Sequence, residues 1–323
     1  MSLAALPDGY TARTATFGDA EAVAELIADC QRAVGDRSGM TVEELLDDWQ
    51  EITLSEDAVA VETPDGRIVA YADVINRSYV SVSVYGYVHP DHRGRGLGSF
   101  LVAWGEGWAR ERMHQAHADA RVVAQFYVNT ADEPARRLLR KLGYMPVRGY
   151  YRMSVELDAV PPEPVWPEGT AVRAFVPDRD ERPVYEAVED AFRDVWGRPR
   201  GTFERFLGFT STEGFDPGLW FVAEVGDDIS GVCLCKVVGG RGEVDVVAVR
   251  RPWRGRGLGL ALLRHALGEL YRRGVREVGL SVDAESLTGA PRLYGRAGLR
   301  VSSSYALFQK ELRPGREPDE TQG

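Results

Sequence analysis

The sequence predicts an α/β protein made of two tandem copies of one domain. The main observation is a repeat, because the hexapeptide Arg93–Gly98 (RGRGLG) recurs letter for letter as Arg254–Gly259, 161 residues later (254 − 93). The chain of 323 residues is also longer than the roughly 250–300 residues at which a single hydrophobic core stops growing. Two folded domains of the same kind are therefore expected.

Each hexapeptide lies between a strand pattern and a helical pattern. The preceding apolar strands end at Val88 and Val249, with four residues between strand and arginine. The following segments carry apolar residues three and four positions apart, which is the spacing of one helix face. These residues are Phe100, Leu101, Trp104 and Trp108 in the first copy and Leu263, Ala266, Leu267 and Leu270 in the second.

The similarity continues on both sides of the hexapeptide. Downstream, strands at 122–128 and 278–282 are followed by helical patterns that end near Gly143 and Gly298. The spacing indicates about six additional residues in the first copy, around 114–119. Upstream, an amphipathic helix is expected with Asp19 as its N-cap. Its apolar stripe comprises Val23, Leu26, Ile27 and Cys30.

Proline marks the boundary between the copies. Four prolines occur within Pro161–Pro167, which excludes a regular helix or strand. The expected organisation is a first domain at 1–158, a linker at 159–169 and a second domain at 170–312. The tail at 313–323 offers little apolar surface to bury and is expected to be disordered.

Composition excludes several classes of protein. A formal net charge of −10 argues against a nucleic-acid binder, and no uncharged apolar stretch is long enough to span a bilayer. Three cysteines, an odd number, do not make a disulfide framework. Cys233 and Cys235 lie two apart in a strand-like run, so they are expected to share one buried face rather than to bind a metal. A cytoplasmic protein, monomeric or homodimeric, is expected.

The glycine-rich hexapeptide predicts a phosphate-binding loop. A strand that ends in such a turn and leads into a helix presents unpaired backbone N–H groups and the positive end of the helix dipole to an anion. The spacing excludes a P-loop, which needs Lys-Ser/Thr after its last glycine. It also excludes the dinucleotide fingerprint, which needs glycine where Ser99 and Leu260 stand.

Both hexapeptides match the pattern Arg-x-x-Gly-x-Gly, and here the chain resembles the GNAT superfamily of acetyl-CoA-dependent N-acetyltransferases. The resemblance covers nearly the whole chain as a tandem, two-domain arrangement. It implies two domains, each with a mixed, mostly antiparallel sheet flanked by helices. It also implies that the pyrophosphate of acetyl-CoA lies on Arg254, Gly255, Arg256, Gly257, Leu258, Gly259 and Leu260, and equivalently on Arg93, Gly94, Arg95, Gly96, Leu97 and Gly98.

The resemblance assigns further coenzyme contacts. Main-chain groups of Val247 and Val249, and of Val88 in the first copy, are expected to bind the pantetheine arm. Many GNAT members place an asparagine after the next strand. The first copy has Asn129 there, whereas the second offers Asp283 and Ser286.

Catalytic groups are expected only in the second copy. By strand alternation Glu243, Asp245, Val247 and Val249 share one face, whereas subtracting 161 gives Val82, Val84, Gly86 and Val88 in the first copy. Tyr294 stands four residues before Gly298, where the first copy has Leu139. The resemblance implies that Glu243 is the general base, through a water molecule, and that Tyr294 is the general acid. Asp245 is the competing base or a contact to the substrate ammonium.

These observations predict an N-acetyltransferase whose second domain transfers an acetyl group from acetyl-CoA to the primary amine of a small molecule by direct attack, with no metal. The first domain is expected to be catalytically degenerate. The alternatives are a protein N-acetyltransferase and a non-catalytic acyl-CoA-binding regulatory module. Aromatic residues could line the acceptor pocket of the second copy or pack in its core; they are Trp196, Phe203, Trp220 and Tyr305.

Overall fold

The computed structural model describes residues 5–36, 39–77, 79–193, 195–196, 201–210, 215–286 and 288–316. The chain divides into two compact units. Among the described residues the first unit comprises 5–150 and 302–316, and the second comprises 151–301. The tail predicted to be disordered lies largely outside the described residues.

The first unit contains most of the first copy. Its helices are α1 (Ala20–Ala33), α2 (Val42–Trp49), α3 (Leu54–Asp57), α4 (Leu97–Arg112) and α5 (Glu133–Lys141). Its strands are β1 (Thr11–Thr14), β2 (Ala58–Glu62), β3 (Ile68–Arg77), β4 (Ser81–Val88), β5 (Val122–Asn129), most of β12 (Arg300–Arg313) and the start of β6 (Met145–Glu156).

The second unit repeats this order of elements. Its helices are α6 (Glu181–Phe192), α7 (Phe203–Thr210), α8 (Leu258–Arg272) and α9 (Ala290–Arg296). Its strands are the end of β6, then β7 (Thr170–Ala174), β8 (Trp220–Val225), β9 (Asp228–Val238), β10 (Arg241–Val249) and β11 (Glu277–Asp283).

Each unit has a mixed, mostly antiparallel sheet, as expected. In the first unit the strand order is β1-β2-β3-β4-β5-β12-β6, and only the β4–β5 pair is parallel among the pairs with a described register. In the second unit the order is β6-β11-β10-β9-β8-β7, and the β10–β11 pair is the parallel one.

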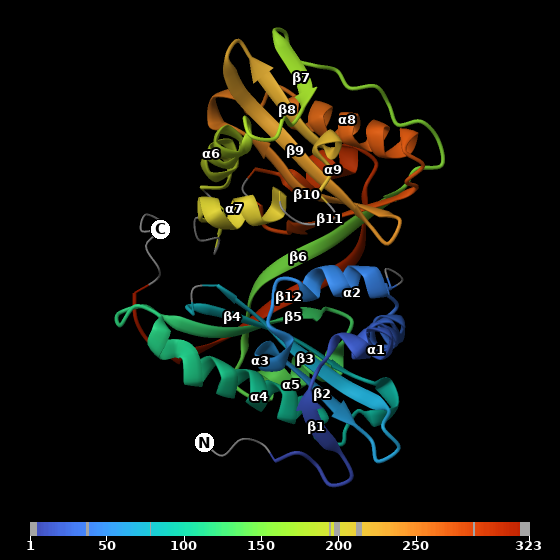
Figure 1. Cartoon of the computed structure of the whole chain (residues 1–323), viewed down its shortest axis with the longest axis vertical. Coiled ribbons are helices and arrows are strands. Elements are labelled where there is room, and N and C mark those ends of the chain that lie inside the picture. Colours follow the sequence, from blue (N-terminus) through green and yellow to red (C-terminus); the bar gives the residue numbers. More distant parts are fainter. Residues whose placement is uncertain are drawn as a thin grey trace. The chain divides into compact units, whose positions relative to one another are not determined.

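Helices cover both faces of each sheet (Figure 1). In the second unit α8 packs on one face over a core that includes Cys233, Cys235 and Val244, while α6 and α7 cover the other over Val222, Val232 and Ala248. In the first unit α4 and the pair α1–α2 take the corresponding places. Cys233 and Cys235 are fully buried with their sulfur atoms 3.8 Å apart, so their expected shared buried face is confirmed.

The last strands of the two copies are exchanged relative to the sequence repeat. Strand β12, at the end of the second copy, pairs with β5 of the first unit. Residues 151–156 of β6, at the end of the first copy, lie beside β11 in the second unit, where Met153 and Leu157 join the core. The compact units therefore divide the chain at residues 150 and 301, while the domain limits of 1–158 and 170–312 remain a prediction.

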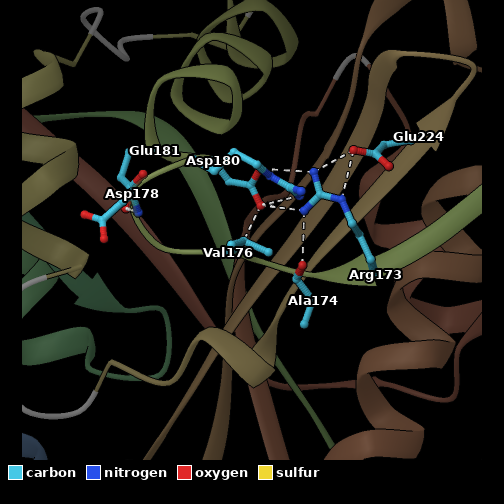
Figure 2. A network of polar contacts seen from close by, with 8 residues as sticks. Arg173, Ala174, Val176, Asp178, Asp180, Glu181 and Glu224 are labelled. Atoms are coloured by element: carbon cyan, nitrogen blue, oxygen red, sulfur yellow. Dashed lines mark hydrogen bonds and ion pairs between the residues drawn. The ribbon is translucent and has the colours of Figure 1, made fainter.

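In each unit, a similar set of ion pairs joins β1 or β7 to the start of the following helix and to the neighbouring strand. In the second unit Arg173 of β7 bonds to Asp180, at the start of α6, and to Glu224 of β8 (Figure 2). In the first unit Arg13 of β1 bonds in the same way to Asp19, 2.7 Å away, and to Glu62 of β2. Asp19 does occupy the N-cap position of α1, but its carboxylate binds Arg13 and Thr16 rather than an amide of the helix.

Candidate active site

The two glycine loops have nearly the same backbone. Gly255 and Gly257 have φ of +76° and +87°, and Gly94 and Gly96 have +77° and +91°. These values lie in the left-handed region, which costs any other residue strain. Gly257 and Gly96 are the N-caps of α8 and α4, so the unpaired N–H groups of each first turn point out of the loop. Both loops have the backbone of an anion site.

The last glycine of each loop allows close packing of the following helix. A Cβ on Gly259 would lie 2.9 Å from Cδ1 of Leu293 in α9, and one on Gly98 would lie 2.8 Å from Cδ2 of Leu138 in α5. The side chains of Leu258 and Leu260 are buried, as is that of Leu97, so these positions can offer only main-chain groups to a ligand. The missing side chain at Gly259 thus allows α9, which carries Tyr294, to pack close to the loop.

The loop arginines bind protein groups in this structure. Arg254 donates to the carbonyl oxygens of Val249, at 3.1 Å, and Ala191 of α6, at 2.7 Å. Arg256 lies over the ring of Trp253. In the first unit Arg93 pairs with Asp132 instead, at 3.0 Å. Arg254 therefore anchors the loop to the end of β10 and to α6.

The N-terminal segment distinguishes the first loop from the second. Cγ of Pro7 would lie 3.1 Å from a Cβ on Gly96. The Tyr10 hydroxyl is 2.9 Å from Nδ1 of His92 and accepts a hydrogen bond from Arg95 at 3.3 Å. At Gly257, by contrast, no heavy atom of the described chain lies within 4 Å of such a Cβ. The N-terminal segment therefore contacts the first loop on one side, while Gly94, Arg95 and Gly96 stay exposed.

Strands β10 and β11 separate beside the second loop. Their described pairing is limited to Gly242 with Val278 and Glu243 with Gly279, so Val247 and Val249 lie on the part of β10 that has left β11. In the first unit β4 and β5 likewise pair only at Ser81–Ser83, before Val88. Such an opening exposes main-chain groups that can pair with an extended ligand. The carbonyl of Val88, however, accepts a hydrogen bond from the Cys30 thiol at 3.3 Å.

A β-bulge at Asp245 overturns the expected alternation along β10. Val244 lies opposite Cys235 and Val246 opposite Leu234, so Asp245 is the additional residue of a bulge in the β9–β10 register. Val244, Val247 and Val249 consequently pack on the core beneath α8, whereas Val246 and Ala248 pack toward α6. The prediction that Glu243, Asp245, Val247 and Val249 share one face is wrong, because the extra residue reverses the alternation.

The bulge also changes the equivalence between the copies. Strand β4 pairs with β3 without interruption, so the first unit has no bulge there. By cross-strand register Glu243, opposite Lys236, corresponds to Ser83, opposite Ile75, and not to Val82 as constant spacing predicted. Asp245 has no counterpart. Only the second unit combines a bulge with two carboxylates at the start of the opening.

The Glu243 carboxylate is held by an arginine from another strand. Arg152 of β6 donates from Nη1 to Oε1 at 2.5 Å and from Nη2 to Oε2 at 2.6 Å. Both side chains are partly exposed, at 29% for Arg152 and 24% for Glu243. Asp245 is exposed on the bulge, next to this pair along β10.

Tyr294 lies on the other side of the sheet from Glu243. It packs against the core beneath α8, whereas Glu243 follows Gly242 and precedes Val244, both of which face that core, and so projects to the opposite side. Burial raises the pKa of Tyr294 to about 12, and the nearby Cys233 adds to the effect. The phenol is therefore protonated at neutral pH. Leu139 takes its place in the first unit and is buried.

The residues after β5 and β11 that were predicted to contact the coenzyme form the same turn in both units. The side-chain oxygen of Asn129 accepts from the N–H of Ala131 at 2.9 Å, and that of Asp283 accepts from the N–H of Glu285 at 2.8 Å. Ser286 lies beside Thr288, with their hydroxyl oxygens 3.0 Å apart. An aspartate reproduces the turn but offers no amide N–H to a ligand.

The aromatic candidates lie in different surroundings. Trp220 is buried in the core cluster beneath α6 and α7, and the partly buried Phe203 packs against this cluster. Tyr305 belongs to the first unit, where its hydroxyl donates to Asp36 at 2.8 Å, so its expected place in the second copy was wrong. Trp196 is 41% exposed.

Sequence reasoning missed Arg152, because it stands 91 residues before Glu243 on a strand that the repeat assigns to the first copy. One local signal existed. Gly279 interrupts an otherwise apolar strand pattern, and an isolated glycine in a strand often marks a close approach by another group. A Cβ at this position would lie 2.4 Å from Nη2 of Arg152.

Comparisons with known proteins agree with this geometry. The profile of the Acetyltransferase (GNAT) family matches residues 182–299, and that of the Acetyltransferase (GNAT) domain matches 55–146. The mycothiol acetyltransferase of Streptomyces bingchenggensis is 32% identical over 304 residues, covering 90% of this chain and 93% of the relative. That of Thermobispora bispora is 36% identical over 220 residues, covering 65% and 70%.

Solved structures show the same arrangement. A GCN5-related N-acetyltransferase from Sphaerobacter thermophilus is 52% identical with a TM-score of 0.90, covering 98% of this chain and 100% of that one. A tandem GNAT protein from the clavulanic acid biosynthesis pathway shares the fold at 17% identity, with a TM-score of 0.71 over 95% of this chain and 100% of that one.

The chain belongs to the GNAT family of acetyltransferases, as a tandem member with two GNAT domains, and it is an N-acetyltransferase. The segments at 242–249 and 282–294, which resemble mycothiol synthase in sequence, form β10 and the connection from β11 to α9.

Two absences hold for the part of the chain that the structure describes. No helix there is long and apolar enough to cross a membrane. No three His, Cys, Asp or Glu side chains in these residues come together as a group that could hold a metal ion.

Proposed function

We propose that the second unit transfers an acetyl group from acetyl-CoA to the primary amine of a small molecule, and that the first unit does not catalyse this reaction. The observation that carries the proposal is the β10 bulge with Glu243 and Asp245 beside it, since β4 has neither the bulge nor the carboxylates. Bulges commonly redirect side chains next to active sites.

The donor would bind along the splayed strand and the loop. The pyrophosphate would lie on the free N–H groups at the start of α8, where Gly255 and Gly257 let the backbone approach it. The pantetheine arm would pair with main-chain groups of Val247 and Val249, placing the thioester toward the bulge. An amide of this segment would then stabilise the negative charge that develops on the thioester oxygen.

The two faces of the sheet would supply different proton-transfer groups. Each oxygen of Glu243 accepts one hydrogen bond from Arg152 and retains a lone pair that can hold a water molecule. Glu243 would accept the ammonium proton through that water, and the exposed Asp245 would hold the ammonium. The free amine would attack the thioester carbonyl directly from the same face.

Tyr294 would act on the sulfur from the other face. With a pKa of about 12 its phenol is neutral and can donate a hydrogen bond to the departing thiolate. An ordinary thiol has a pKa of about 8.5, so full proton transfer to a solvated thiolate would be uphill by about 5 kcal/mol. Donation of a hydrogen bond therefore precedes proton transfer, which becomes favourable as burial makes the thiolate more basic.

The relatives named mycothiol acetyltransferase supply the first acceptor to test, the free-amine precursor that acetylation would convert to mycothiol. Coenzyme A release should be followed by chromatography, because an acceptor with its own thiol reacts with thiol reagents. Release with this amine, or with another small primary amine, is the expected result.

Variants then distinguish the two carboxylates. Glu243→Gln should lower kcat, and Asp245→Asn should chiefly raise KM for the amine, while Ser83→Ala in the first unit should change neither. Acetyl-CoA binding without release for any amine would instead indicate a regulatory module. Release only with peptide amines would indicate a protein acetyltransferase.

A further inference from the structure

Three neighbouring strands of each unit carry comparable rows of residues. In the second unit Glu243 of β10 lies opposite Gly279 of β11, and Arg152 of β6 reaches across that glycine. In the first unit Ser83 of β4 lies opposite Gln125 of β5, and Gln309 of β12 completes the row. Glu243 and Gly279 are equivalent by register to Ser83 and Gln125, and the third residue comes from β6 in one row and from β12 in the other; the rows differ in charge.

The row of the first unit is neutral and fully connected. Gln125 donates to Oγ of Ser83 at 2.7 Å, and Gln309 donates to Oε1 of Gln125 at 3.0 Å. Neutral hydrogen bonds therefore suffice to join three strands at this place. A partly buried ion pair loses hydration and is often no more stabilising than a neutral replacement, so packing alone does not explain the charges of the second unit.

Gly279 makes the charged row possible. A Cβ there would stand 2.4 Å from Nη2 and 2.8 Å from Cζ of Arg152, distances that real Cβ atoms do not adopt. The guanidinium consequently passes directly over the β11 backbone and meets both oxygens of Glu243 in the planar, two-point geometry that a lysine cannot supply.

The pair lies where β10 and β11 begin to separate. Glu243 is the last residue of β10 with a described partner on β11, and the bulge follows two residues later. A carboxylate on this site would otherwise be free to rotate about three side-chain bonds. The two hydrogen bonds from Arg152 hold it in one orientation next to the opening.

We infer that Arg152 is a positioning residue for the acetyl transfer proposed above: it holds the Glu243 carboxylate in place for the acceptor amine, and Gly279 provides the room for it. This inference rests on the proposed function. It also gives the first copy a role in the reaction, since β6 is the last strand of the first copy in sequence but places residues 151–156 in the second unit. A first copy without catalytic groups still supplies a strand that the second unit needs.

The test compares three changes in the full chain. Arg152→Gln removes the charge, Arg152→Lys keeps the charge but not the two-point contact, and Gly279→Ala displaces the guanidinium. Each should lower kcat by roughly 10- to 100-fold, the cost of a misplaced reacting group, while the Kd for acetyl-CoA stays within about twofold. Arg241→Gln is the matched control, because Arg241 of β10, two residues before Glu243, forms a cross-strand ion pair with Glu277 of β11. It should leave kcat unchanged.

A double mutant separates positioning from folding. In a Glu243→Gln background, Arg152→Gln should lower kcat by less than about twofold more, because there is no carboxylate left to hold. A full additional loss there, or normal kcat in Arg152→Gln alone, would overturn the inference. Circular dichroism and the melting temperature of each variant show whether a loss of kcat comes from misfolding. If Arg152→Gln misfolds, the kcat of the Arg152→Lys variant tests the inference instead.

Failure of the proposed function gives a different result. If the wild-type protein binds acetyl-CoA but releases no coenzyme A with any amine, the proposed function is refuted and the inference with it. An active wild type whose Arg152 variants are equally active refutes the inference alone.

Discussion

Substituting Gly257 by alanine should weaken acetyl-CoA binding, and the same change at Gly96 should not. Gly257 has φ of +87°, and an L-residue held in that left-handed conformation costs about 1–2 kcal/mol. No heavy atom of the described chain lies within 4 Å of a Cβ on Gly257, so a clash adds nothing to this strain. If the free variant relaxes its loop, binding must restore the native backbone. The Kd should then rise by about 5- to 30-fold.

The first loop provides the matched control. Gly96 has φ of +91°, so an alanine there carries the same local strain. Pro7 lies against this loop, and Tyr10 bonds to His92 and Arg95, so we expect the N-terminal segment to hinder a ligand there. A change at Gly96 should therefore leave the Kd within about twofold of the wild-type value.

Calorimetric titration with acetyl-CoA measures both quantities. The wild-type protein should bind one acetyl-CoA per chain, with a weaker Kd in Gly257→Ala and an unchanged one in Gly96→Ala. Two sites per chain, or equal weakening by the two alanines, would refute the reasoning, because the first loop would then also hold the coenzyme.

Three further predictions concern catalysis, pH and strand exchange. Tyr294→Phe should lower kcat by about 100-fold or more with an unchanged Kd for acetyl-CoA, whereas Tyr271→Phe, at the end of α8 beneath Arg276, should alter neither in the same chromatographic and calorimetric assays. Hydrogen bonds from Arg13 lower the pKa of Asp19 to about 2, so its stabilising contribution is complete above its ordinary pKa of 3.8 and is lost as the pH falls through 2. Asp19→Asn should accordingly cost about 1 kcal/mol in urea unfolding at pH 7, a value reduced by solvent screening, and progressively less below pH 4; a constant difference across this range would contradict the assignment. Residues 159–323 expressed alone should fail to fold by circular dichroism, because they lack Met153 and Leu157, which fill the core beneath α8. A folded fragment that binds acetyl-CoA would show that β6 is dispensable.

Much of the fold could be predicted because its signals are local. The two hexapeptides place glycine where the backbone must be left-handed, and apolar residues three and four apart mark α4 and α8. Tyr294 is predicted from its spacing to Gly298, which follows two residues after the end of α9. These inferences depend on residues a few positions apart, whose geometry the local backbone determines.

The facing of Glu243 and its contact with Arg152 could not be predicted in the same way. Alternation along β10 assumes uninterrupted pairing with β9, and the bulge at Asp245 breaks that assumption. The bulge exists only in the pairing of two strands, so nothing in the residues 243–249 by themselves reveals it.

The sequence by itself determined the duplication, both glycine loops, the membership in the GNAT family and the difference between the copies at Tyr294, where the first copy has Leu139. Tertiary structure alone decided that Glu243 faces away from Val247, that β6 and β12 are exchanged relative to the repeat, and that Arg152 meets Glu243 across Gly279. The physical reason is that a strand satisfies its hydrogen bonds with any suitable neighbour. Which neighbour it takes is decided by contacts between residues far apart in the chain.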